Sequence, residues 1–193
     1  MNDPENLVYI DEHGLIGSNF YWHKFASKGL TKEDILQAGL TSDRVQVARE
    51  IIEPLQRAEE SLRTLGYRLY IKEGYRAKSL YEIVYQRRVE KFGKEETDSL
   101  INMEGMPHAE GLSVDVALWS LADNTEVYLR NGDDGTAALF THFYKDKEDK
   151  ASKHYQELQD LLINTMMTQG FRLGTKKEYF HFDYRPDMLP NYL

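Results

Sequence analysis

The stretch EGMPHAEGLSVDVAL (residues 104–118) sets a histidine and an aspartate on either side of a glycine. On a continuous helix His108 and Asp115 would lie two turns apart, roughly 10 Å, which is too far for two ligands of one metal ion. On a continuous strand their odd separation directs the two side chains to opposite faces. They converge only if the chain bends between them, and Gly111 tolerates the positive φ angle that such a bend needs.

We therefore expect a loop, a bend at Gly111 and then a strand. Val114, Val116 and Leu118 share one face of that strand, and Asp115 lies on the other. A simpler interpretation also exists, in which the histidine belongs to a loop and the aspartate to a turn or a helix cap. A metal site requires a third ligand.

Composition excludes several classes of protein. The length of 193 residues suits one domain, residues 1–193, and 41% hydrophobic residues are enough for an ordinary globular core. A net charge of −8 argues against a nucleic-acid partner, and the lack of cysteine excludes disulfides and thiolate ligands. Neither a signal peptide nor a stretch of transmembrane length is present, so we expect a cytoplasmic protein with no membrane partner. No feature indicates an oligomeric state.

Hydrophobic periodicity and turn residues predict helices and strands along the whole chain. Helices are expected near 31–38, at 43–65 with Ser42 as the cap and a kink at Pro54, at 79–92 and at 150–169. Strands are expected at 67–76, 113–118, 171–174 and 178–184, with an irregular segment at 119–148. This order predicts an α+β domain with a small, mostly antiparallel sheet flanked by helices and a metal site on the sheet.

The stretch EYFHFDY (residues 178–184) supplies a candidate third ligand. Its alternation places His181 and Asp183 on one face and aromatic side chains on the other. A histidine in the middle of an aromatic strand is either a satisfied core histidine or a ligand. Together with His108 and Asp115 it makes a His–Asp–His set that suits catalytic zinc, with the fourth position left for water.

Two further charged residues suit chemistry at such a site. Glu178 stands three residues before His181, at the start of the strand, where a carboxylate can reach a metal-activated water without ligating the metal; that is the position of a general base. Arg76 follows a predicted strand, and its fixed donors suit a carboxylate or a developing oxyanion. A surface arginine paired with Glu73 is the alternative, and it is favoured when Arg76 is considered alone.

Three motifs occur in one order: EGYR (73–76), HAEGLSVD (108–115) and EYFH (178–181). In order and spacing they resemble the D-alanyl-D-alanine dipeptidase family, zinc peptidases related to bacterial D,D-carboxypeptidases. The resemblance covers about residues 45–186. Each motif is weak by itself, and the combination is specific.

The resemblance implies one zinc ion per chain, held by His108, Asp115 and His181. It implies Glu178 as the general base and Arg76 as the residue that stabilises the transition state. The implied reaction is hydrolysis of a D-Ala-D-Ala dipeptide, with a small D,D-peptide as the only partner.

The chain departs from the family pattern at several positions. The family usually has serine, alanine and tryptophan where this chain has Met106, Ser113 and the pair Tyr179–Phe180. In strict dipeptidases an aspartate holds the free amino group of the substrate, and Thr141 or His142 stands at that place here. The zinc chemistry is untouched, and these changes predict tolerance of an N-acylated peptide.

Three alternative functions follow from the same residues. A D,D-carboxypeptidase that removes terminal D-Ala from longer peptidoglycan peptides is the nearest. A non-haem Fe(II) oxygenase also uses two histidines and one carboxylate, but its usual His-x-Asp pair lies on one strand, unlike the spacing found here. A non-catalytic, metal-containing peptide-binding module has no need of Glu178 as a base.

Overall fold

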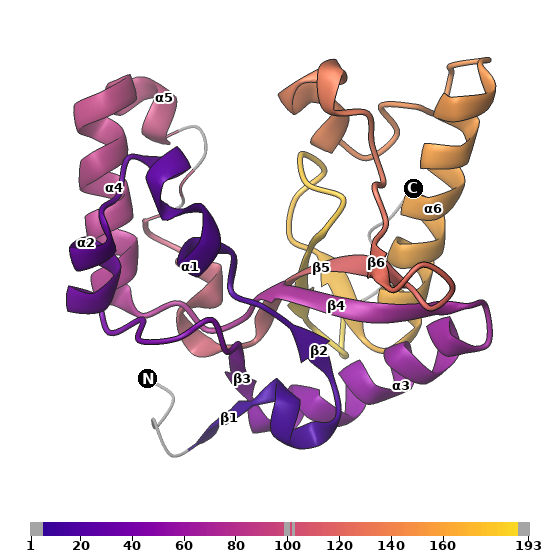
Figure 1. The fold of residues 1–193 in the computed structure, drawn as a ribbon, viewed down its shortest axis with the longest axis horizontal. Helices are drawn as coiled ribbons and strands as arrows, with labels where there is room; N and C mark the ends of the chain where they lie inside the picture. Colours follow the sequence, from indigo (N-terminus) through magenta and orange to yellow (C-terminus); the bar gives the residue numbers. More distant parts are fainter. Residues whose placement is uncertain (1–5, 99–100, 102, 189–193) are drawn as a thin grey trace.

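The computed structural model describes residues 6–98, 101 and 103–188. Among these residues six strands form a central sheet, in the order β2-β4-β5-β8-β7 with β6 added on β5 (Figure 1). The pairing of β2 with β4 is parallel and the other pairings are antiparallel. The strands are β2 (Ile16–Gly17), β4 (Tyr67–Glu73), β5 (Ser113–Ser120), β6 (Thr125–Glu126), β7 (Phe171–Leu173) and β8 (His181–Tyr184).

The main core lies between this sheet and the helices α3 (Ile52–Arg63) and α6 (Lys150–Thr168). The two helices contact each other and bury leucines against the apolar face of the sheet. On β5 the buried apolar residues are Val114, Val116 and Leu118, as the alternation predicts. The opposite face of β5, which carries Asp115, is therefore free to build a polar site.

A second, smaller core joins α1 (Phe20–Lys24), α2 (Lys32–Gln37) and α4 (Lys78–Phe92). These helices, with α5 (Lys94–Asp98), lie on the left of Figure 1, apart from α3 and α6. A capping box fixes the start of α2, where the Thr31 hydroxyl accepts from Asp34 N and the Asp34 carboxylate accepts from Thr31 N.

The predicted helix at 43–65 is wrong in its first third. Gln46–Ala48 is a strand, β3, paired with β1 (Leu7–Tyr9), and a 3-10 turn follows it before α3 begins at Ile52. Val47 is fully buried opposite Val8, and this pairing outweighs the local helical pattern. Pro54 lies in the first turn of α3, where a missing N–H costs no hydrogen bond, and the helix continues from there to Arg63.

The other main elements agree with the sequence. The helices α2, α4 and α6 fall at the predicted positions, and β4, β5 and β7 begin within a residue of theirs. The last strand is shorter than expected and starts at His181, because the preceding residues form a turn. The predicted α+β class is confirmed.

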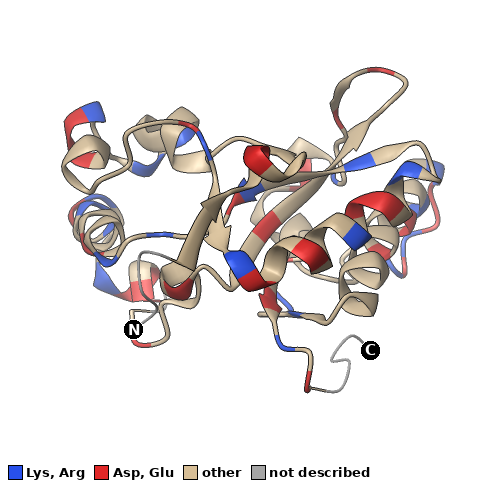
Figure 2. Ribbon diagram, turned by 90° about the horizontal axis from the view of Figure 1, so that it is seen from below, with Lys and Arg blue, Asp and Glu red and all other residues tan. Residues whose placement is uncertain are grey.

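Acidic and basic residues are interspersed along the helices (Figure 2). Within the described ranges, every helix falls short of the length and apolarity that crossing a bilayer requires.

Candidate metal centre

The register of the sheet aligns three polar residues across three strands. Asp115 on β5 pairs with Glu73 on β4 and with His181 on β8. Residues directly opposite each other in antiparallel strands project from the same face, so the three side chains share the face turned away from the main core. An irregularity between Ile71 and Glu73 shifts the β4 register and brings Glu73 onto this face.

His108 reaches the same face from a 3-10 turn, Pro107–Glu110, which ends at Gly111. Gly111 has a φ of 71°, so the expected bend is confirmed. A Cβ at this glycine would lie 2.8 Å from Ala48 N, so a side chain is excluded for steric reasons as well. The bend folds His108 back over the start of β5.

The structure brings the three predicted ligands together. His181 Nδ1 lies 2.8 Å and His108 Nε2 lies 3.5 Å from Asp115 Oδ1, and the three donor atoms are all within 4.8 Å of one another. Ligand atoms about 2.0–2.2 Å from a tetrahedral zinc ion are separated by roughly 3.3 Å, which these spacings approach. Both histidines are buried, with exposed fractions of 2% and 6%. Two imidazoles and one carboxylate match the donors that zinc prefers.

The charges of this cluster reinforce one another. Burial would raise the pKa of Asp115, but the two neighbouring histidines hold it well below its usual range. Burial would lower the pKa of His181, but hydrogen bonds with Asp115 and Asp183 raise it to about 10. The cluster therefore keeps the Asp115 carboxylate ionised between two imidazoles, and a bound zinc ion would take both imidazoles as neutral ligands.

Contacts beyond the cluster fix the ring of His108. Its Nδ1 donates to Gly74 O at 2.8 Å, and because a carbonyl can only accept, the proton is on Nδ1 and the Nε2 lone pair faces Asp115. The backbone N–H of His108 donates to the Tyr81 hydroxyl at 3.0 Å. The backbone N–H of Arg76 donates to His108 O at 3.1 Å. The connection between β4 and α4 thus orients this histidine.

A different set of contacts fixes His181. Its Nε2 lies 3.5 Å from Asp183 Oδ1, and the Ser113 hydroxyl donates to the same carboxylate oxygen at 2.5 Å. Gly174 lies against the ring, where a Cβ would be 2.3 Å from the ring carbon Cδ2. Ser113 is one of the departures from the family pattern. Its hydroxyl contacts Asp183, which in turn lies beside the ring of His181.

Arg76 is largely buried, with 11% of its side chain exposed, and its guanidinium is held on several sides. Nε lies 2.7 Å from Glu73 Oε1 and Nη2 lies 2.5 Å from Glu73 Oε2, while the rings of Tyr21 and Tyr81 lie 4.9 Å and 4.4 Å from the guanidinium carbon. The alternative expected from sequence, an ion pair with Glu73, is present, but it is buried rather than on the surface. Burial would lower the pKa of Arg76, and the charge of Glu73 keeps it well above its usual value. Nη1 donates to no described residue and remains available to a ligand.

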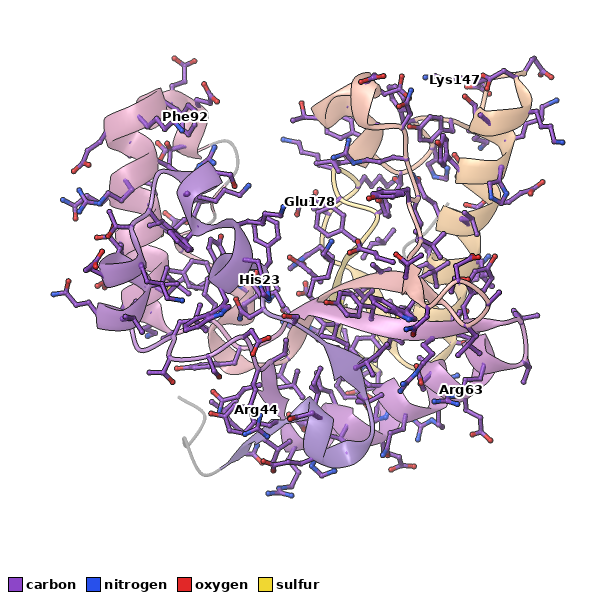
Figure 3. The ribbon with its side chains drawn as sticks, viewed as in Figure 1. His23, Arg44, Arg63, Phe92, Lys147 and Glu178 are labelled. Carbon is purple, nitrogen blue, oxygen red and sulfur yellow. The ribbon has the colours of Figure 1, made fainter. Side chains whose placement is uncertain are left out.

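Glu178 lies in the turn before β8 and is not among the three clustered donors. In Figure 3 it lies on the side of this turn that faces α1. Burial, and then the charge of Asp115, raise the pKa of Glu178. A partly buried carboxylate with a raised pKa, next to the cluster but outside it, has the properties of a general base.

The segment that carries Thr141 packs beside Glu178. Tyr179 N donates to Leu139 O, and both the backbone N–H and the hydroxyl of Thr141 donate to Lys176 O. The hydroxyl of Thr141 is thus engaged with the backbone of the turn that holds Glu178.

Sequence analysis missed several neighbours of the cluster. Tyr21 comes from the N-terminal segment that resembles nothing in the family, and it carried no signal. Tyr81 follows Arg76 of the EGYR motif by five residues and was not singled out. Asp183 was placed on the face of His181, but no role was given to it.

No protein-family model matches the chain, and no curated protein matches its sequence. The fold is similar to that of the LdcB LD-carboxypeptidase, whose structure addresses peptidoglycan recognition, with a TM-score of 0.49 and 16% identity over 74% of this chain and 61% of that one. It is also similar to the vancomycin-resistance D,D-pentapeptidase VanY, solved with Zn(II), with a TM-score of 0.48 and 16% identity over 72% of each chain.

Proposed function

We propose that this protein is a zinc-dependent peptidase that hydrolyses the bond between two D-residues, with D-Ala-D-Ala as its substrate. The observation that carries the proposal is the grouping of His108, Asp115 and His181 on one face of the sheet, with Glu178 and Arg76 beside them. A metal-binding module without catalysis would not require the last two residues there.

His108 Nε2, Asp115 Oδ1 and His181 Nδ1 are the atoms that would hold one zinc ion. When bound, zinc polarises a substrate carbonyl and lowers the pKa of a bound water. Three protein donors would leave the fourth position of a tetrahedral zinc ion to water or substrate.

Glu178 is the general base in this proposal. Its carboxylate takes the proton of the water that attacks the scissile carbonyl, and it then passes this proton to the leaving amine. Its raised pKa supports the role, because proton transfer is most efficient when the pKa of the base approaches the working pH.

Arg76 stabilises the tetrahedral oxyanion. Its charge is permanent, and Glu73, Tyr21 and Tyr81 hold the guanidinium in place before substrate binds. A donor that is already oriented needs no reorganisation during the reaction, which is the basis of oxyanion stabilisation.

A D,D-carboxypeptidase acting on longer peptides is the second candidate. Thr141 supports it, since its hydroxyl donates to a backbone carbonyl of the turn before β8 and offers no charge to a substrate ammonium group. A buried carboxylate at that place would favour a free amino terminus.

Metal analysis and one pair of substrates test the proposal. After dialysis the protein should retain about one zinc ion per chain by mass spectrometry. It should hydrolyse both D-Ala-D-Ala and N-acetyl-D-Ala-D-Ala, with comparable kcat/KM if Thr141 relaxes selection at the amino end. Activity on the free dipeptide alone would favour a dipeptidase and refute the D,D-carboxypeptidase. Absence of zinc and of turnover on both substrates would refute the proposed function.

A further inference from the structure

One polar atom beside Arg76, the hydroxyl of Tyr21, has no partner in the described part of the chain. Tyr21 lies in the first turn of α1, and only 7% of the residue is exposed. Its hydroxyl forms no hydrogen bond with a described residue, yet it is not one of the buried polar atoms that are left without a partner. The hydroxyl is therefore the open end of a buried ring, and it is free to donate to a ligand.

The start of α1 holds Tyr21 in place. Asn19, which is buried, caps this helix, and its side-chain oxygen accepts from Tyr21 N at 2.9 Å. The backbone N–H of Asn19 donates to Asp43 O at 2.7 Å, so the cap is itself tied to the segment before β3. The ring of Phe20 packs edge-on against that of Tyr21, with centroids 5.6 Å apart. The position of the Tyr21 ring is thus fixed both through its backbone and by a neighbouring ring.

The ring of Tyr21 lies against the guanidinium of Arg76. The guanidinium carbon is 4.9 Å from the centre of this ring and 4.4 Å from the centre of the Tyr81 ring. Glu73 occupies Nε and Nη2 of the guanidinium, so Nη1 is the donor that remains for a ligand. Two available donors, one charged and one neutral, therefore belong to two side chains in direct contact.

The charges that act on Tyr21 relate its hydroxyl to the metal cluster as well. Burial raises the pKa of Tyr21 well above its usual value; the charge of Arg76 opposes this rise, and the charges of Glu73 and then Asp115 add to it. Asp115 is a candidate zinc ligand, so the hydroxyl lies close enough to the cluster for that charge to act on it. Glu178 lies on the side of its turn that faces α1, the helix that carries Tyr21 (Figure 3). Because its pKa is raised, the phenol keeps its proton at neutral pH and can donate to an anion.

We propose that the hydroxyl of Tyr21 is a second hydrogen-bond donor to the oxyanion, beside Nη1 of Arg76. The inference rests on the proposed peptidase function and adds one catalytic residue to it. The hydroxyl donates to the oxygen of the scissile carbonyl as that oxygen gains negative charge, and the proton stays on Tyr21 throughout. Because its neighbours hold the ring before substrate binds, this donor stabilises the charged oxygen without reorganisation. Tyr21 lies outside the three motifs that resemble the dipeptidase family.

Kinetics and binding of the Tyr21→Phe protein test this role, since the substitution keeps the ring and removes only the hydroxyl. With N-acetyl-D-Ala-D-Ala, kcat should fall about 10–100-fold, the usual effect of losing one hydrogen bond to a charged group. Binding of the intact substrate, measured by calorimetry in the zinc-loaded Glu178→Gln background, should not change. A phosphinate whose tetrahedral phosphorus replaces the scissile carbonyl carbon should bind more weakly to Tyr21→Phe by the same factor as the loss in kcat. Tyr85→Phe is the matched control, because its hydroxyl contacts Asp98 on α5, and all three values should stay at wild type.

Two results would overturn the inference: an unchanged kcat in Tyr21→Phe, or an equal loss of affinity for the substrate and the phosphinate, which would place Tyr21 in ground-state binding. All proteins are compared at equal zinc content. The two proposals fail separately. If an active wild type is matched by an equally active Tyr21→Phe, the role of Tyr21 is refuted and the peptidase stands. If the wild type hydrolyses neither D-Ala-D-Ala nor its N-acetyl derivative, the peptidase is refuted and the phosphinate decides: weaker binding to Tyr21→Phe supports the donor, and equal binding refutes it.

Discussion

Asp115 and His181 lie directly opposite each other on β5 and β8, and their side-chain atoms Oδ1 and Nδ1 are 2.8 Å apart. The register of the sheet therefore fixes two of the three candidate ligands. A slip of β8 by one residue would turn His181 toward the core and away from Asp115, so the pairing of the two strands fixes this geometry. Only His108 depends on a loop, and Gly74, Tyr81 and the backbone of Arg76 hold it.

Replacing any one of the three candidate ligands should remove most of the bound zinc. His108→Ala, Asp115→Ala and His181→Ala should each lose most of the zinc, because three donors from the protein are the minimum for a stable catalytic site. Zinc content after dialysis against a weak chelator measures this. His154→Ala, which removes an exposed histidine on α6, is the control and should keep full occupancy. Full zinc occupancy in His181→Ala would disprove the ligand assignment.

Asp183 should tune the metal without binding it. A carboxylate behind a ligating histidine orients the ring, and losing it typically costs about 10–100-fold in metal affinity. Asp183→Asn should therefore raise the zinc Kd by about tenfold or more. Ser113→Ala should raise it by less, because the Ser113 hydroxyl contacts Asp183 and Pro107 O but neither ligating ring. Competition with a chelator gives the affinities, and the visible spectrum of the cobalt-substituted protein reports the geometry. An unchanged Kd and spectrum in Asp183→Asn would assign Asp183 a merely structural role.

Arg76 should not be replaceable by lysine. Arg76→Lys keeps the charge but loses the planar fork that Glu73 holds, so the oxyanion loses an oriented donor. We expect kcat to fall about 10²–10³-fold, the cost of removing one such donor, with little change in KM. Steady-state kinetics on D-Ala-D-Ala provides the measurement, and zinc content should stay normal. A rise in KM with unchanged kcat would place Arg76 in ground-state binding instead.

The grouping of His108, Asp115 and His181 was predictable from the sequence, because it depends on residue type and local pattern. The side chains of His108 and Asp115 can meet only if the chain bends between them, and Gly111 permits that bend. His181 lies in a stretch where polar and aromatic residues alternate. The strand at Val47 was not predictable, because Val47, Ile51 and Leu55 also fit one face of a helix. The pairing of Val47 with Val8 on β1, 39 positions earlier, makes this segment a strand.

The supporting residues were harder to predict for the same reason. Asp183 touches Ser113 across 70 positions of sequence, and Tyr21 meets Arg76 only after α1 folds against α4. Neither contact leaves a periodic trace in the sequence.

Glu178 should make the stability of the metal-free protein depend on pH. Its pKa is raised in the folded protein, so between the ordinary and the raised pKa the folded state binds more protons than the unfolded state. The free energy of unfolding must then fall as pH rises through this window. Glu178→Gln removes the titration, so its stability relative to wild type should grow across the window and then level off.

Urea denaturation of the metal-free proteins at a series of pH values measures this difference. Glu157→Gln, an exposed position on α6, is the control and should show a much smaller dependence on pH. A difference between Glu178→Gln and wild type that stays constant with pH would contradict the raised pKa.

The same substitution separates a base from a ligand. If Glu178 is the base, Glu178→Gln should keep its zinc, since His108, Asp115 and His181 are unchanged and the side chain is nearly isosteric. Its kcat should nevertheless fall by about 10²–10⁴-fold, the usual contribution of general acid–base catalysis. Zinc content and kcat are measured on one preparation. Loss of metal together with activity would make Glu178 a ligand, whereas normal zinc with near-normal turnover would remove it from the mechanism and favour a metal-containing peptide-binding module over a peptidase.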